Sequence, residues 1–121
     1  MSLKHMKTLI VLVVGLLSVG CASLRDSVVG EYERKDEDGN TYKRVFLDNG
    51  VYEYHYNGKK EEEFKWSIVD GEIHIVIDGG REVLVSRINK DSSITFIAKI
   101  DTDGERTDFP KERQMTLKKI K

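Results

Sequence analysis

An all-β domain of about eight antiparallel strands is the fold that this sequence predicts, and two observations indicate it. From Val28 onward, apolar and polar side chains alternate along short segments. Phe64, Trp66 and Ile68, for example, share one face of a strand, as expected when one face meets a core and the other meets water. Six Asn-Gly or Asp-Gly pairs separate the segments, and these residue types accept the backbone conformations of tight hairpin turns.

The strands can be placed from the alternation and the turns. We expect them near residues 28–34, 41–47, 51–56, 62–69, 72–77, 81–88, 94–100 and 113–120. The short links favour an up-and-down meander, which forms either a small closed barrel or a curled sheet. Residues 101–112 form the longest loop, and no helical periodicity is found outside the N-terminal segment.

The bulky residues of the alternating faces predict a filled interior rather than a spacious cup. Eight strands enclose a space just wide enough for side chains or for one small ligand. The residues expected to point inward are Val29, Tyr32, Phe46, Tyr52, Tyr54, Phe64, Trp66, Ile73, Ile75, Val83, Val85, Ile88, Phe96, Ile100 and Leu117.

The first 20 residues have the layout of a helical secretion signal. Lys4 and Lys7 precede an apolar run from Leu9 to Gly20, as in the positively charged and hydrophobic regions of a signal peptide. The run is about half of the roughly 20 apolar residues that cross a bilayer. The uncharged stretch continues to Leu24, so an uncleaved anchor is the alternative. We expect a signal over 1–20, a tether over 21–27 and a β domain over 28–121.

The segment Leu17-Ser18-Val19-Gly20-Cys21 resembles the lipobox of bacterial lipoproteins. The resemblance implies that the Cys21 thiol receives a diacylglycerol and that the chain is cut just before it. Cys21 is the only cysteine, so no internal disulfide is possible in an oxidising compartment. Cleavage after Ala22 by the general signal peptidase is the alternative. The resemblance further implies an exported lipoprotein held by its N-terminal lipid, on the outer membrane if the host has one and otherwise on the cell exterior.

Charge and side-chain chemistry exclude several function classes. Removing residues 1–20 leaves 18 basic and 21 acidic residues, whereas a nucleic-acid binder needs a strong positive field. His55 and His74 are separated from one another, and the two Asp-x-Asp-Gly turns lack the spacing of a calcium loop. No serine has a nucleophile-elbow context. We therefore expect no enzyme, no metal and no cofactor.

The domain also resembles the small lipocalin-like β domains of bacterial envelope lipoproteins. Three segments carry the resemblance: 29–32 (VGEY), 46–52 (FLDNGVY) and 65–73 (KWSIVDGEI). Because that group has no common activity, the resemblance implies fold alone. We expect a membrane-tethered module that binds an envelope protein through its strand faces and the 101–112 loop. The alternative is a carrier of a small apolar ligand, with Tyr52, Tyr54 and Trp66 as the ligand-binding wall.

Overall fold

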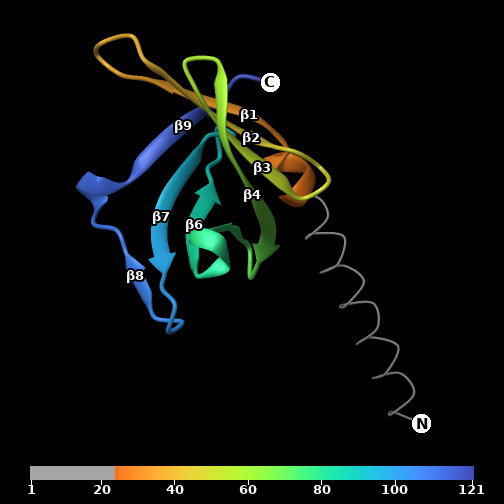
Figure 1. The fold of residues 1–121 in the computed structure, drawn as a ribbon, viewed down its shortest axis with the longest axis vertical. Coiled ribbons are helices and arrows are strands. Elements are labelled where there is room, and N and C mark those ends of the chain that lie inside the picture. Colours follow the sequence, from red (N-terminus) through yellow and green to blue (C-terminus); the bar gives the residue numbers. More distant parts are fainter. Residues whose placement is uncertain (1–23) are drawn as a thin grey trace.

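Nine strands follow one another along the chain in the computed structural model, which describes residues 24–121 (Figure 1). Residues 24–28 form a short helical turn before the first strand. The predicted signal segment and Cys21 lie outside the described residues. The strands are β1 (Gly30–Lys35), β2 (Thr41–Phe46), β3 (Val51–Tyr56), β4 (Lys59–Val69), β5 (Glu72–Ile77), β6 (Glu82–Ile88), β7 (Ile94–Ile100), β8 (Arg106–Asp108) and β9 (Met115–Lys119), with 3-10 turns η1 (Asp78–Gly80) and η2 (Lys111–Arg113).

Eight of these strands close into an antiparallel barrel, one of the two forms that the sequence predicts. Each strand from β1 to β7 pairs with the next, and β9 pairs with both β7 and β1. The eight strands expected from the alternation correspond to β1–β7 and β9. The remaining strand, β8, pairs only with β7, at residues 98–100 beyond the stretch 94–96 that pairs with β9.

Tight turns connect the hairpins where the Asn-Gly and Asp-Gly pairs stand. Asn57 and Gly58 have φ values of 48° and 82°, and Asp70 and Gly71 have 51° and 79°. Two successive positive φ values define the type I′ turn, whose twist matches that of the flanking strands. The local turn chemistry therefore fixes which strands become neighbours.

Three predictions about the C-terminal half and the leader are wrong. The segment 101–112 is not a structureless loop, because it contains β8 and part of η2. A helical turn exists outside the signal, at residues 24–28. Val83, Val85 and Ile100 do not face the interior: Val83 pairs with Ile100 and Val85 pairs with Ala98 on the outer face, while Leu84 packs against the core.

A β-bulge in β7 explains the error at Ile100. The register of β6 and β7 shifts between Val85 and Ser86, which leaves Ile97 without a direct partner. One extra residue turns every following side chain to the opposite face. Phe96 consequently faces the core, whereas Ala98 and Ile100 face outward.

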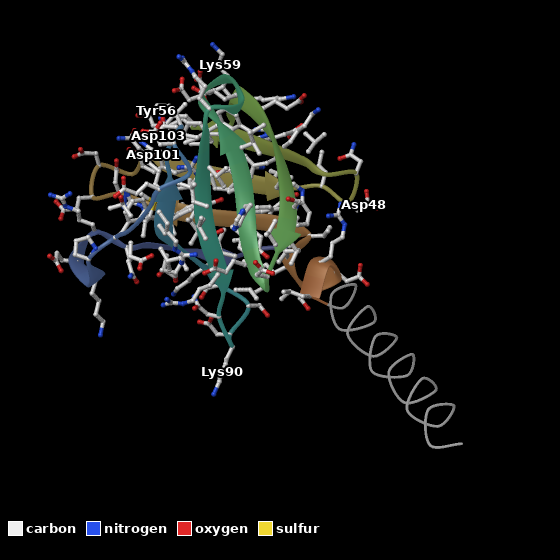
Figure 2. All side chains as sticks on the ribbon, turned by 90° about the horizontal axis from the view of Figure 1, so that it is seen from below. Asp48, Tyr56, Lys59, Lys90, Asp101 and Asp103 are labelled. Atoms are coloured by element: carbon white, nitrogen blue, oxygen red, sulfur yellow. The ribbon has the colours of Figure 1, made fainter. Side chains whose placement is uncertain are left out.

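The barrel has two different ends. At one end, which we call the helix end, the helical turn 24–28 lies beside the turns at 47–50, 70–71 and 89–93. The other, the far end, carries the turns at 36–40, 57–58, 78–80 and 101–105. Figure 2 shows Lys90 and Asp48 toward the first end and Lys59, Tyr56 and Asp101 toward the second.

The hydrophobic core fills the helix end. Val28, which has no exposed surface, closes this end of the barrel. Tyr32 is also fully buried, and its hydroxyl donates a 2.6 Å hydrogen bond to the Val28 carbonyl. The buried cluster consists of Val28, Tyr32, Phe46, Tyr52, Trp66, Ile73, Ile75, Ile94, Phe96 and Leu117. Close packing of this kind leaves little room for a ligand in this half of the barrel.

Candidate binding site

The inward face changes from apolar to polar toward the far end of the barrel. Arg44 pairs with the core residue Tyr32 on β1 and with Tyr54 on β3, so its side chain belongs to the inward face. The same register places further polar and aromatic side chains beside it. We call this group the far-end cluster: Arg34, Tyr42, Arg44, Tyr54, Tyr56 and Glu62.

Both arginines of the cluster are stacked on aromatic rings. The Arg44 guanidinium carbon lies 4.1 Å from the centre of the Tyr54 ring and 5.7 Å from that of Phe96. The Arg34 guanidinium lies 5.2 Å from the Tyr42 ring. Stacking occupies the faces of a guanidinium and leaves the N–H donors at its edges available for hydrogen bonds.

Those donors are incompletely satisfied. The Nε atoms of Arg34 and Arg44 are buried and have no hydrogen-bond partner among the described residues. The described residues form eight salt bridges, and neither arginine takes part in any of them. A buried donor without a partner is costly, so the cluster is suited to receive an acceptor group from outside the barrel.

Tyr52 adds a second unpaired group below the cluster. Its side chain is 1% exposed, and its hydroxyl has no hydrogen-bond partner among residues 24–121. Burial raises the pKa of Tyr52 to about 12, against the opposing effect of the nearby Arg44 guanidinium. The hydroxyl is therefore protonated at neutral pH and able to donate.

The structure brings two of the three predicted ligand-wall residues together. Tyr52 and Tyr54 follow each other on the inward face of β3, beside Arg44. Trp66 instead lies in the filled half, where its indole N–H donates to the Leu47 carbonyl at 2.9 Å and Arg25 covers its ring at 4.5 Å. The packing of Trp66 is thus explained without a ligand.

Sequence reasoning missed the two arginines. A signal was present, because Tyr42, Arg44 and Phe46 alternate on one side of β2 and Phe46 was expected to point inward. The apolar pattern drew attention to the aromatic residues alone. Only the three-dimensional arrangement shows that both guanidinium groups lack a charged partner.

A surface hollow of about 490 Å³ lies close to this group, where β4 and β5 diverge. Their pairing ends at Lys65 and Val76, so the first half of β4 is paired only with β3. The hollow is lined by Glu63, Phe64, Lys65, Val76, Gly79 and Gly80. Phe64 connects it to the interior, since its ring centre lies 6.0 Å from that of Tyr52. A volume of this size is in the range of small-molecule sites.

The two domain histidines lie on the outer face, as predicted. His55 contacts the Glu53 carboxylate at 3.0 Å, and Lys60 bridges Glu53 and Glu63. The His55 contact is the main cause that holds the pKa of Glu53 below its ordinary range. No group of three or more His, Cys, Asp or Glu side chains in the described residues is arranged to hold a metal ion.

The acidic turns are explained by their own hydrogen bonds. The Asp36 carboxylate accepts from the backbone amides of Asp38 and Asn40, and Asp101 accepts from those of Asp103 and Glu105. Asp36 also accepts from the Asn40 side chain, which is the main reason that its pKa is lowered. Such bonds stabilise turns without a cation.

Comparison with known proteins identifies no relative of this chain. No protein-family model, no curated protein and no solved structure matches it. Among the helices within residues 24–121, none has the length and apolar character needed to span a membrane. The function of this chain is therefore inferred from the geometry of the barrel and from the N-terminal sequence pattern.

Proposed function

We propose that this chain is the precursor of an exported bacterial lipoprotein, anchored through Cys21, whose β-barrel is a binding module of the cell envelope. The lipobox-like segment ending at Cys21 supports the anchor. Only two residues separate Cys21 from Leu24, the first described residue of the helical turn at the helix end. A lipid on Cys21 would therefore hold the helix end near the membrane and leave the far end directed away from it.

One observation carries the binding role: the far-end cluster and Tyr52 keep buried donors without partners. Folded proteins pair nearly all buried polar groups, so exceptions require an explanation. A ligand that supplies acceptors is one explanation, and it agrees with the position of the group at the end of the barrel away from the proposed anchor. We expect no catalytic role for these residues.

A carrier of a small apolar ligand is the second candidate. The hollow beside Phe64 favours it, because its lining is mainly apolar and its volume is about 490 Å³. The filled core at the helix end argues against the deep apolar cavity that such a carrier would use. The two candidates differ in whether the ligand needs a charged group that accepts hydrogen bonds from Arg44.

The anchor is tested by labelling the full chain, produced in a bacterium, with an alkyne analogue of palmitate. We expect the wild-type chain to be labelled and to sediment with membranes, and we expect Cys21→Ser to be unlabelled. A matched Ser23→Ala variant should behave as the wild type. An unlabelled wild-type protein whose mass shows cleavage after Ala22 would contradict the anchor without affecting the barrel.

A further inference from the structure

We propose that Arg44 and Tyr52 bind the carboxylate of an amphiphilic ligand, whose apolar body occupies the hollow beside Phe64. The inference rests on the proposed role of the barrel as a binding module and names the ligand class of that module. Three observations carry it: an inward guanidinium without a charged partner, a fully buried hydroxyl without a partner, and a hollow one side chain away.

The site offers donors and no free buried acceptor of comparable strength. Arg44 can only donate, and Tyr52 keeps its proton at neutral pH. A ligand that satisfies both must therefore bring acceptor atoms, and a negative charge on those atoms complements the half-buried guanidinium of Arg44. The planar fork of a guanidinium matches a carboxylate through two parallel hydrogen bonds.

Glu62 favours a singly charged ligand. It lies opposite Tyr54 on the inward face, and its negative charge is near enough to raise the pKa of Tyr52 slightly. Repulsion from this carboxylate grows with the charge of the ligand, so a doubly charged phosphate monoester is disfavoured relative to a carboxylate. Glu62 is exposed and can turn toward water when the ligand binds.

The hollow accounts for the apolar part of the ligand. It lies where β4 leaves β5, and Phe64 forms the wall between it and Tyr52. A carboxylate that enters past Phe64 leaves its attached chain in the hollow, against Phe64 and Val76. Burial of that chain gives affinity, while the arginine fixes the orientation of the head group.

Calorimetric titration of residues 23–121, which contain all the strands and core residues that the structure describes, tests the proposal with three probes. Decanoate has both parts of the ligand, decanol has only the apolar part, and acetate has only the carboxylate. We expect decanoate to bind at least about ten times more tightly than either of the others, since one charge-assisted pair is worth roughly that factor. Octyl phosphate at pH 8, where it is doubly charged, should bind more weakly than decanoate.

Variants assign the head group to its residues. Arg44→Gln should reduce decanoate affinity about tenfold or more, and Arg44→Lys, which keeps the charge without the fork, should recover only part of it. Tyr52→Phe removes a single oxygen and should weaken binding severalfold, whereas Glu62→Gln should strengthen it. Arg87→Gln, an exposed arginine on the outer face of β6, is the matched control and should leave binding unchanged.

Each alternative result overturns the proposal in a distinct way. Equal affinity for decanol and decanoate would show that the barrel binds apolar ligands without recognising a carboxylate. The proposed head-group site would then be rejected, while the proposed binding role of the barrel would stand. Binding of acetate as tight as that of decanoate would show a free-anion site. Absence of heat with every probe, for a protein whose circular dichroism shows a folded β domain, would reject the site altogether, and palmitate labelling of Cys21 would still report on the anchor.

Discussion

At the scale of single residues, Ser86 is the clearest polar exception in the core. It pairs with Ile73 on β5 and with Phe96 on β7, both core residues, and so it faces the interior. Its side chain has no exposed surface, and its hydroxyl has no hydrogen-bond partner among the described residues. Burying such a hydroxyl costs free energy that an apolar side chain would not.

We therefore expect Ser86→Ala to raise the free energy of unfolding by about 1 kcal/mol, because it removes the unpaired hydroxyl and leaves only a small change in volume. Urea unfolding followed by circular dichroism measures the difference. Ser67→Ala, on the exposed face of β4, is the control and should change stability little. A loss of stability in Ser86→Ala would mean that the hydroxyl has a partner after all.

Residues also show how far alternation can locate a site. The phase of β3 was correctly predicted, so Tyr52 and Tyr54 were recognised as inward residues. The same rule applied to β2 would have placed Arg44 beside them, but charged residues are rarely buried, and Arg44 was not among the residues expected to point inward. Whether an inward arginine has a partner depends on contacts between strands that are distant in sequence.

At the scale of elements, the turns were predictable and the irregularities were not. Asn-Gly and Asp-Gly pairs determine hairpins through local backbone preference alone. The register of β6 was ambiguous, because Val83, Leu84 and Val85 are all apolar and either phase satisfies the alternation. The bulge at Ile97 and the short strand β8 depend on pairing with β7, which no local pattern reports.

An ion pair holds β8 against the barrel and yields a prediction on pH. Arg106 of β8 reaches across β7 and β6 and donates to both Glu72 oxygens at 2.7 and 2.9 Å. It crosses the outer face where Val85 and Ala98 are fully buried. The Arg106 hydrogen bonds are the largest cause that lowers the pKa of Glu72 from its ordinary value of 4.5.

Glu72→Gln should therefore lower the free energy of unfolding at pH 7 by about 0.5–1 kcal/mol, a value limited by solvent screening because Arg106 is partly exposed. A lowered folded-state pKa stabilises the fold above pH 4.5, and this contribution disappears as the pH falls through the folded-state value. The difference between wild type and variant should thus be smaller at pH 3 than at pH 7. Urea unfolding at both pH values tests this, with the exposed Glu37→Gln as control. A difference of equal size at the two pH values would assign the effect to packing.

At the scale of the whole molecule, closure of the barrel followed from counting strands and short links. What the pattern could not show was how the helix end is sealed. Residues 24–27 were expected to be a plain tether, and the structure instead places Arg25 over Trp66 and joins it to the Asp48 carbonyl at 2.8 Å. Four residues carry too little periodicity to reveal a docked turn, and their contacts come from strands that are distant in the sequence.

Because the turn is docked, the stability of the barrel should depend on residues 24–29, which precede the first strand. A chain that begins at Gly30 loses the buried Val28 side chain and leaves the Tyr32 hydroxyl without its acceptor, the Val28 carbonyl. We expect it to be less stable than a chain from Ser23 by about 3 kcal/mol, the sum of an apolar burial and an unpaired buried hydroxyl.

Two point variants of the chain from Ser23 separate these contributions in urea unfolding. Val28→Ala keeps the carbonyl and should lose about 1.5 kcal/mol from reduced burial alone, while the exposed Asp26→Ala should be close to neutral. If the shortened chain is as stable as the longer one, residues 24–29 are only a linker, and the barrel end nearest Cys21 is sealed by strand residues alone. If the expected order is found, the segment next to the proposed anchor is part of the fold, and the far-end cluster lies at the end of the barrel away from that segment.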